Sequence, residues 1–306
     1  MYYSMSFLQY YQNNQTPYDI SGMGDLGVTR NTWEHWHLVP TSRPSINPPS
    51  PKTSYVSIEG RNGKLDLSQA LTGYPTYDNR TGSIDFVVMN DYRNWQVAYT
   101  DIMTTIHGKK LMMVYEEDPG YYYVGRWTVS KWNTGKDYST ITFSYDLEPY
   151  KYSIIDCAGS WLWDPFNFNT GIIASRSDGV TTGANLDNVE IPGIYLLNTD
   201  YYRGDIVTDN IGTGLLNEQE GIANVIGNAP GSLYLQVIPS EGYTIRLDFQ
   251  NPEVYSEPLT KIYTPEATFS GEDPDFVITN YTGVNQLLLS ASGTGRVNWN
   301  FRPGRL

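Results

Sequence analysis

The sequence has little cysteine, little charge and no long apolar run. Its single cysteine, Cys157, excludes an intramolecular disulfide, so folding does not depend on an oxidising compartment. Charged residues make up only 17% of the 306 residues, and no stretch approaches the apolar length that a transmembrane helix needs. The first residues lack a basic leader followed by an apolar segment, so we expect no signal peptide and synthesis in a cytoplasm.

The motifs of common enzyme classes are also absent: there is no G-x-S-x-G, no H-E-x-x-H and no phosphate-binding P-loop. Carboxylates cluster at residues 116–118 and 272–275, and glycoside hydrolysis uses a carboxylate pair. Turn residues flank both clusters, which favours solvated turns over a glycosidase. His35 and His37 offer two metal ligands on one side of an expected strand, but a third ligand is missing. We therefore predict no catalysis, no cofactor and no metal.

The net charge is −13 and is unevenly distributed. Residues 1–150 hold 12 basic against 15 acidic side chains, a balance of −3, whereas residues 151–306 hold 8 against 18, a balance of −10. Binding to a phosphate backbone needs a basic surface. The charge therefore argues against a nucleic-acid-binding protein.

Aromatic residues are abundant, at 14% of the chain with 26 tyrosines and 8 tryptophans, and they favour antiparallel sheets. One segment is typical of a helix: Tyr92–His107, with Asp91 as the cap and Gly108 as the stop. Apolar positions at helical spacing define its buried face: Trp95, Tyr99, Ile102 and Ile106. A shorter helical turn is expected over Leu65–Leu71.

Alternating apolar and polar residues predict strands elsewhere. In the first half a strand over Ser83–Met89 precedes the helix, and a three-strand meander follows it. The second half shows short strands between turns and no helix, which predicts a β-sandwich. Its clearest strands are Leu233–Val237, Tyr243–Phe249 and Val297–Phe301. A change of charge and a proline at Glu148–Lys151 predict two domains, residues 1–152 and residues 153–306.

A proline-rich segment, Pro40–Pro51, follows an aromatic stretch that begins at Trp33. Proline cannot donate to a sheet ladder, so this segment should be an extended and stiff arm. It leads into a short strand, Ser54–Glu59, with Val56 and Ile58 on one face. Two interpretations stay open: the arm is a surface connection packed on its own domain, or it reaches a neighbouring subunit.

This region resembles the N-terminal signature of the distal tail protein (Dit) family of siphophages and prophages of Gram-positive bacteria. The matching residues are Trp33, Trp36–Leu38, Pro40–Pro44, Pro48–Pro49, Lys52–Thr53, Tyr55–Val56, Ile58, Gly60, Gly63, Leu65–Ser68, Asn79–Gly82, Phe86, His107–Lys109 and Trp161–Phe168. Together they cover the first half well and only the opening of the second half.

The resemblance implies a mostly β protein with a tail-tube-like β-barrel or sheet domain bearing one helix, followed by a galectin-like β-sandwich. It implies a structural virion protein at the tip of a long non-contractile tail. A hexameric ring would join the tail tube protein to the tail hub or tail lysin and anchor receptor-binding or baseplate proteins. DNA would pass through the ring without specific binding, and no membrane insertion is expected.

Two sets of contact residues follow from these patterns. The subunit interface is predicted to include Trp33, Trp36, Pro40, Arg43, Pro44, Pro48, Pro49 and Tyr55. Packing at the domain junction is predicted for Trp161, Trp163, Pro165, Phe166 and Phe168. The same junction aromatics could instead form a sugar-stacking platform, so a carbohydrate-binding module that attaches to the bacterial cell wall is the alternative function. Tyr195, Tyr201 and Tyr202 are expected on a solvent-side strand or loop.

Overall fold

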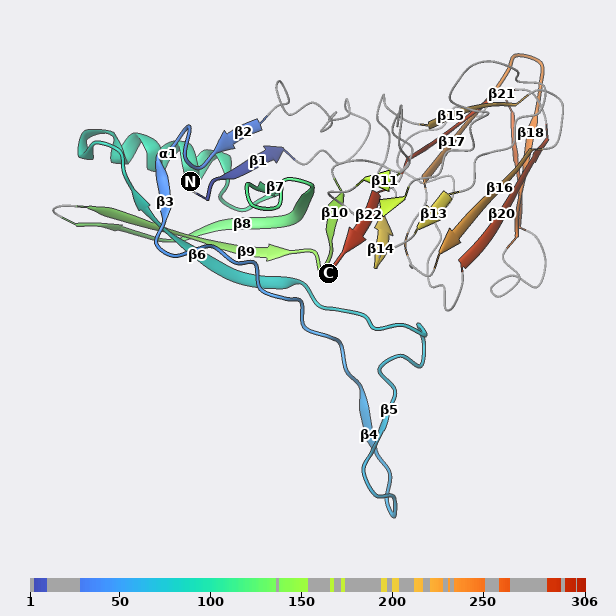
Figure 1. The fold of residues 1–306 in the computed structure, drawn as a ribbon, viewed down its shortest axis with the longest axis horizontal. Coiled ribbons are helices and arrows are strands. Elements are labelled where there is room, and N and C mark those ends of the chain that lie inside the picture. The colour runs from blue at the N-terminus through green and yellow to red at the C-terminus, as the bar shows by residue number, and fades with distance from the viewer. Residues whose placement is uncertain are drawn as a thin grey trace.

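The computed structural model describes residues 3–9, 28–135, 138–153, 166–167, 172–173, 194–196, 200–203, 212–216, 221–227, 231, 234–250, 259–264, 285–292, 295–300 and 302–306. These residues form mostly β-strands, with one α-helix (Figure 1). The mostly β fold class with one helix is therefore confirmed.

The largest sheet has ten strands and is built mainly from the first half of the chain. The long central strand β8 pairs with β7 along one edge, and with β10 and then β9 along the other. Its strands are β1 (Met5–Gln9), β2 (Val28–Asn31), β3 (Leu38–Pro40), β6 (Arg80–Val88), β7 (Lys109–Tyr115), β8 (Tyr121–Thr134), β9 (Ser139–Leu147), β10 (Lys151–Ser153), β14 (Tyr201–Arg203) and β22 (Arg302–Arg305).

The ten-stranded sheet curls around an apolar core. In β6, Ile84, Phe86 and Val88 are buried while Asp85 is exposed, because alternate side chains point to opposite faces. The rings of Phe7 in β1 and Phe143 in β9 lie 6.3 Å apart, although these strands are not neighbours in the sheet. The curl therefore brings distant strands together, and each large side chain buried there contributes about 1.5–3 kcal/mol.

The helix packs against this core. It begins with the 3₁₀ turn η1 (Tyr92–Asn94) and continues as α1 (Trp95–Thr105), within the predicted segment. The first turn is tight because the Asp91 carbonyl accepts the Asn94 amide at 2.8 Å. Gly108 has φ +75, which confirms the predicted stop. In the described part of the chain, no helix has the length and apolar character needed to cross a membrane.

The second half contributes short strands in separate sheets. One sheet has the order β13-β16-β20-β18-β19, a second has β15-β21-β17, and β11 pairs with β12. These strands are β11 (Phe166–Asn167), β12 (Ile172–Ile173), β13 (Ile194–Leu196), β15 (Gly212–Leu216), β16 (Gly221–Gly227), β17 (Tyr234–Pro239), β18 (Ile245–Gln250), β19 (Leu259–Tyr263), β20 (Asn285–Ser292) and β21 (Gly295–Asn300). The three strands singled out from the sequence correspond to β17, β18 and β21.

Two strands from the second half return to the first. β22 pairs with β10 through Tyr152 and Gly304, and β14 pairs with β22 on its other side. The predicted boundary after residue 152 falls inside β10, so both halves of the chain contribute to this sheet. The domain limits themselves stay a prediction.

Between β3 and β6 the chain leaves the sheet and forms a long projection (Figure 1). Its far end is a two-stranded ribbon of β4 (Tyr55–Ser57) and β5 (Lys64–Asp66). The helical turn expected over Leu65–Leu71 is wrong at its start, because Leu65 pairs with Val56 in the ribbon. A turn follows from Leu67, where the Ala70 amide donates to the Leu67 carbonyl at 3.1 Å.

Candidate functional site

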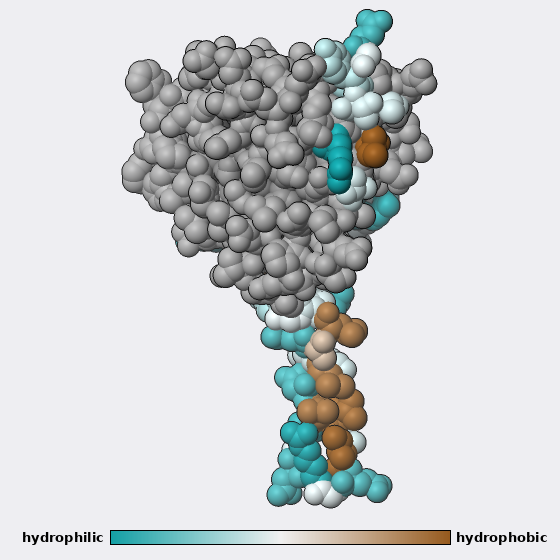
Figure 2. Space-filling view, turned by 90° about the vertical axis from the view of Figure 1, so that its right-hand side faces the viewer, coloured by the Kyte–Doolittle hydropathy of each residue, from teal (hydrophilic) through white to brown (hydrophobic). Residues whose placement is uncertain are grey.

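The projection comprises residues 48–79, and from here on the name arm refers to these residues alone. Packing within the chain does not explain it. It extends away from the ten-stranded sheet (Figure 1). An extended chain rises by at most about 3.3–3.6 Å per residue, so the tip lies up to roughly 40 Å along the chain from the root. Apolar residues gather along one side of the arm and hydrophilic residues along the other (Figure 2).

The register of the ribbon explains this two-sided surface. Val56 pairs with Leu65 and Tyr55 pairs with Asp66, and neighbouring pairs point to opposite faces. The apolar face carries Val56, Ile58, Leu65 and Leu67, and the polar face carries Tyr55, Ser57, Lys64 and Asp66. On the apolar face, Val56 is 43% exposed, Ile58 45% and Leu67 39%. A lone two-stranded ribbon is marginally stable in water, so this face is suited to packing on another surface.

Hydrogen bonds between its two strands keep the arm extended. The Lys52 amide donates to the Thr76 carbonyl and the Asp78 amide donates to the Ser50 carbonyl, both at 2.8 Å. Nearer the tip, the Leu67 amide donates to the Ser54 carbonyl at 2.8 Å. The arm is thus a paired ribbon that presents its apolar face in a fixed direction.

The root of the arm is anchored by Asn47 and Arg80. The Asn47 amide donates to the Tyr145 hydroxyl at 3.0 Å, and its side chain donates to the Thr81 carbonyl at 2.8 Å. Arg80 is 6% exposed and donates to the carbonyls of Pro149 at 2.7 Å and Asn47 at 3.3 Å. Burial lowers the pKa of the Arg80 guanidinium, whose charge lies 5.8 Å from the centre of the Tyr123 ring. Both ends of the arm are therefore anchored where they leave the sheet.

A tyrosine cluster links the arm root to the strands that return from the second half. Tyr77 of the arm meets Tyr150 edge-on at 6.1 Å, and Tyr150 stacks on Tyr201 of β14 at 4.7 Å with an interplanar angle of 8°. Burial raises the pKa of the Tyr150 and Tyr201 hydroxyls. Tyr201, expected on a solvent-side strand or loop, instead packs in this cluster.

The predicted interface residues divide into two groups. Pro48, Pro49 and Tyr55 lie on the arm, where Pro48 and Tyr55 are exposed. The other members, Trp33, Trp36, Pro40, Arg43 and Pro44, precede the arm. The chain packs on the sheet before the arm begins, because Arg43 forms an ion pair with Glu117 at 3.0 Å and Pro44 is buried. The interpretation as a packed surface connection fits this first part, and the interpretation as a reaching arm fits the second.

Trp36 is part of the protein's own core, with 1% of its surface exposed. Its indole Nε1 donates to Asp101 Oδ2 at 2.7 Å, and Arg30 Nε donates to the same oxygen at 2.9 Å. The Arg30 guanidinium, with help from Trp36, holds the pKa of the Asp101 carboxyl below its usual range. This group of three side chains fixes α1 to the turn after β2.

The residues considered for chemistry have structural partners. His35 and His37 lie at a turn rather than on one side of a strand, because residues 32–36 form turns and His37 has φ +53. His35 Nδ1 accepts the Asn31 amide at 3.1 Å. Glu116 binds the Ser4 amide at 2.8 Å and Asp118 binds Lys151 at 2.6 Å. Across the described ranges, no group of three or more metal-ligating side chains comes together.

Several predicted residues lie outside the described residues. They are Cys157, Trp161, Trp163, Pro165, Phe168 and the carboxylates at 272–275. Phe166 is described only through its backbone, which pairs with Ile173 in the β11–β12 ribbon. The predicted packing at the domain junction therefore stays a prediction.

Sequence reasoning did not single out Leu65, Leu67 and Leu71 as members of an apolar surface on the arm. Leu71 is 97% exposed, and Leu65 completes the apolar face opposite Val56. The signal was the alternation in Lys64–Leu67, which mirrors the alternation in Ser54–Ile58 across a loop with two glycines. Gly60 and Gly63 both have φ +80, a conformation that suits glycine in the loop between the strands.

No protein-family model matches the sequence, and no curated protein matches it. Among solved structures, the chain is similar to the crystal structure of the SPP1 Dit (gp 19.1) protein, described as a paradigm of the hub adsorption apparatus in phages that infect Gram-positive bacteria. The two chains are 9% identical, and the match covers 99% of each chain with a TM-score of 0.45.

Proposed function

We propose that this chain is a structural protein of a phage tail tip that assembles, through its arm, into a closed ring of identical copies, a hexamer in the family it resembles. The single observation that carries the assembly is the ribbon at the end of the arm, whose apolar face is exposed while its polar residues lie on the opposite face. An apolar face on a projecting ribbon is stabilised when a second protein covers it.

The type of assembly that we propose uses the projection of the arm from one side of the molecule. In the proposed ring, the arm docks on a different surface of the next copy. Such a head-to-tail contact closes into a ring when the rotation between neighbours is right. The resemblance to the distal tail family, over residues 33–109 and again at Trp161–Phe168, supports placing this ring at the tip of a long non-contractile tail.

The remaining parts of the chain fit the same proposal. The near-neutral first half, with a balance of −3, suits a ring whose channel lets DNA pass without holding it. The separate five-stranded and three-stranded sheets of the second half support a β-sandwich, which in the proposed ring faces outward. The ring would join the tail tube protein to the hub or tail lysin and would carry receptor-binding or baseplate proteins.

The assembly is tested by the native mass of three proteins over a concentration series: the parent, Val56→Glu and Ser57→Glu. The two variants add the same charge to adjacent residues of β4, on opposite faces of the ribbon. We expect the parent to form a ring and Val56→Glu to need at least tenfold more protein to assemble, about 1.4 kcal/mol, because a carboxylate would be buried without a partner. Ser57→Glu should assemble as the parent does.

Two results would contradict the proposal. A parent that stays monomeric at every concentration, alone and with tail-tube protein, would remove the ring. Equal assembly of the parent and Val56→Glu would show that the apolar face of the ribbon is not the contact.

A further inference from the structure

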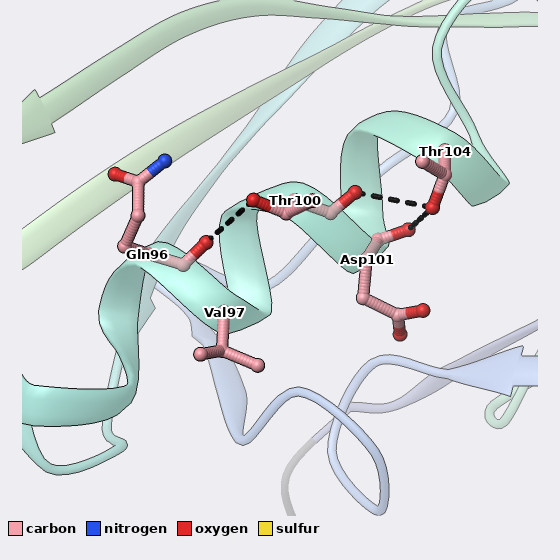
Figure 3. Close-up of a pocket in the computed structure, with 5 residues that line it drawn as sticks. All are labelled: Gln96, Val97, Thr100, Asp101 and Thr104. Atoms are coloured by element: carbon pink, nitrogen blue, oxygen red, sulfur yellow. Dashed lines mark hydrogen bonds between the residues drawn. The ribbon is translucent and has the colours of Figure 1, made fainter.

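A groove lies along the helix α1, and Figure 3 draws the side chains that line it. The groove has a volume of about 410 Å³, and the described residues that line it are Gln96, Val97, Thr100, Asp101 and Thr104. Binding pockets for small ligands measure about 300–1,000 Å³, so this groove has room for a few side chains. Val97 is 69% exposed at the groove, which makes it one of the most exposed large apolar residues outside the arm.

The hydroxyls of Thr100 and Thr104 and the carboxylate of Asp101 already have partners within the chain, and the Gln96 side chain is exposed to solvent. The Thr100 hydroxyl donates to the Gln96 carbonyl at 2.9 Å, and the Thr104 hydroxyl donates to the Asp101 carbonyl at 3.0 Å (Figure 3). The Asp101 carboxylate is occupied by Arg30 and Trp36. Because the threonine hydroxyls bond to the helix backbone, their methyl groups and Val97 remain for contact. Apart from the Gln96 amide, the groove therefore offers contact to apolar side chains.

The groove and the arm lie on different sides of one copy. The arm joins the first residue of β6, Arg80, and the segment leading to α1 follows its last residue, Val88. A strand of this length spans roughly 26 Å at 3.3 Å per residue. In Figure 1, α1 lies on one side of the curled sheet and the arm projects on the other. A copy's own ribbon does not meet its own groove, so the two can meet only between copies.

We infer that the groove on α1 receives the apolar face of the ribbon from a second copy of this chain. The inference rests on the proposed ring and deepens it by naming the receiving surface. The occupant is assigned from the chain itself, because the ribbon offers uncovered apolar side chains and the groove offers apolar contact with paired polar groups. A ring of identical copies needs one such donor and one such acceptor on every copy.

The test uses the full chain with Val97→Arg, which places a charge in the groove. Met89→Arg is the matched control, because Met89 is 62% exposed and does not line the groove. Both side chains are exposed, so both variants should keep the melting temperature of the parent. We expect Val97→Arg to need at least tenfold more protein to assemble, and Met89→Arg to assemble as the parent does.

A mixture of two variants separates donor from acceptor. Val97→Arg keeps an intact ribbon and Val56→Glu keeps an intact groove, so each alone should be monomeric at a concentration where the parent forms rings. Mixed in equal amounts, they can form only one working contact and should give a one-to-one dimer that does not grow.

Each outcome has a defined meaning. A parent that assembles together with a Val97→Arg variant that assembles equally well would overturn the inference and leave the ring intact. A monomeric mixture would also overturn it, because Val97 would then act by another route. A parent that never assembles would overturn both the ring and its receiving surface.

Discussion

The strands β6 and β4 have similar alternating sequences but opposite surroundings. In β6, Ile84 is 4% exposed and Phe86 is 0% exposed. In contrast, Val56 in β4 is 43% exposed, and the nearby Ile58 is 45% exposed. The difference arises from what lies against each strand: β6 pairs on both edges and faces the curled sheet, while β4 pairs only with β5. The same pattern therefore stabilises the fold in one place and remains available for contact in the other.

This comparison separates residues that fold the chain from residues that assemble it. The core sheet should respond to substitutions through its free energy of unfolding. The ribbon should respond through the concentration at which copies associate, with little change in unfolding.

Trp36→Ala should destabilise the fold by about 3–5 kcal/mol, because it removes a large side chain from a packed core. It also takes away the indole that donates to Asp101. Ile58→Ala, on the ribbon, should change the free energy of unfolding by less than about 0.5 kcal/mol. Chemical denaturation of both variants measures the difference, and comparable losses would show that the ribbon is part of the folding core.

The placement of Trp36 shows where sequence reasoning reached its limit. Aromatic residues beside a stiff segment suit an interface, so the sequence predicts a subunit contact for the tryptophans before the arm. Only the fold reveals that the turn over residues 32–36 directs Trp36 toward Phe7 and Phe143, with ring centres at 6.3 Å and 6.4 Å. A Trp36→Ala variant that fails to assemble would thus report on folding rather than on contact.

Local patterns predicted the helix and most strands, because periodicity is a local signal. The helix is expected from Tyr92, where the 3₁₀ turn η1 begins, and the meander after it corresponds to β7, β8 and β9. The pairing of β10 with β22 joins Tyr152 to Gly304, and no local pattern indicates a partner so distant in sequence. The sequence predicts only half of the ribbon: alternation indicates the apolar face of Val56 and Ile58, whereas the partner strand has the pattern of a helical turn.

Tyr201→Ala should cost about 1–2 kcal/mol and loosen the arm root. The substitution removes the stack on Tyr150, and such aromatic pairs contribute about 0.5–1.5 kcal/mol beyond their buried area. Tyr77 of the arm contacts Tyr150 edge-on, and Tyr150 would then no longer be held in place by Tyr201. Hydrogen exchange should become faster at the amides of Lys52 and Asp78, whose hydrogen bonds join the outgoing and returning segments of the arm.

Tyr138→Ala is the matched control for this prediction, because Tyr138 is 62% exposed and precedes β9, away from the arm. It should leave exchange at the arm root unchanged. Equal exchange in the parent and in Tyr201→Ala would mean that the returning strands do not steady the arm, and that Asn47 and Arg80 are sufficient anchors.

The smallest expected effect concerns acid stability and the Arg30–Asp101 pair. The folded-state pKa of Asp101 lies below its unfolded value of about 3.9, so the pair stabilises the fold above that pH and is lost as pH falls through the folded value. Because the Asp101 side chain is 35% exposed, solvent screening limits the contribution to about 0.5–1 kcal/mol. Asp101→Asn should lose that amount at neutral pH and show a shallower decline in stability from about pH 5 to pH 2. Denaturation curves across this pH range measure the difference in stability. Parallel declines in the parent and the variant would show that Asp101 is held by Trp36 and by burial rather than by its charge. In that case α1 and its groove would stay fixed in position even in acid.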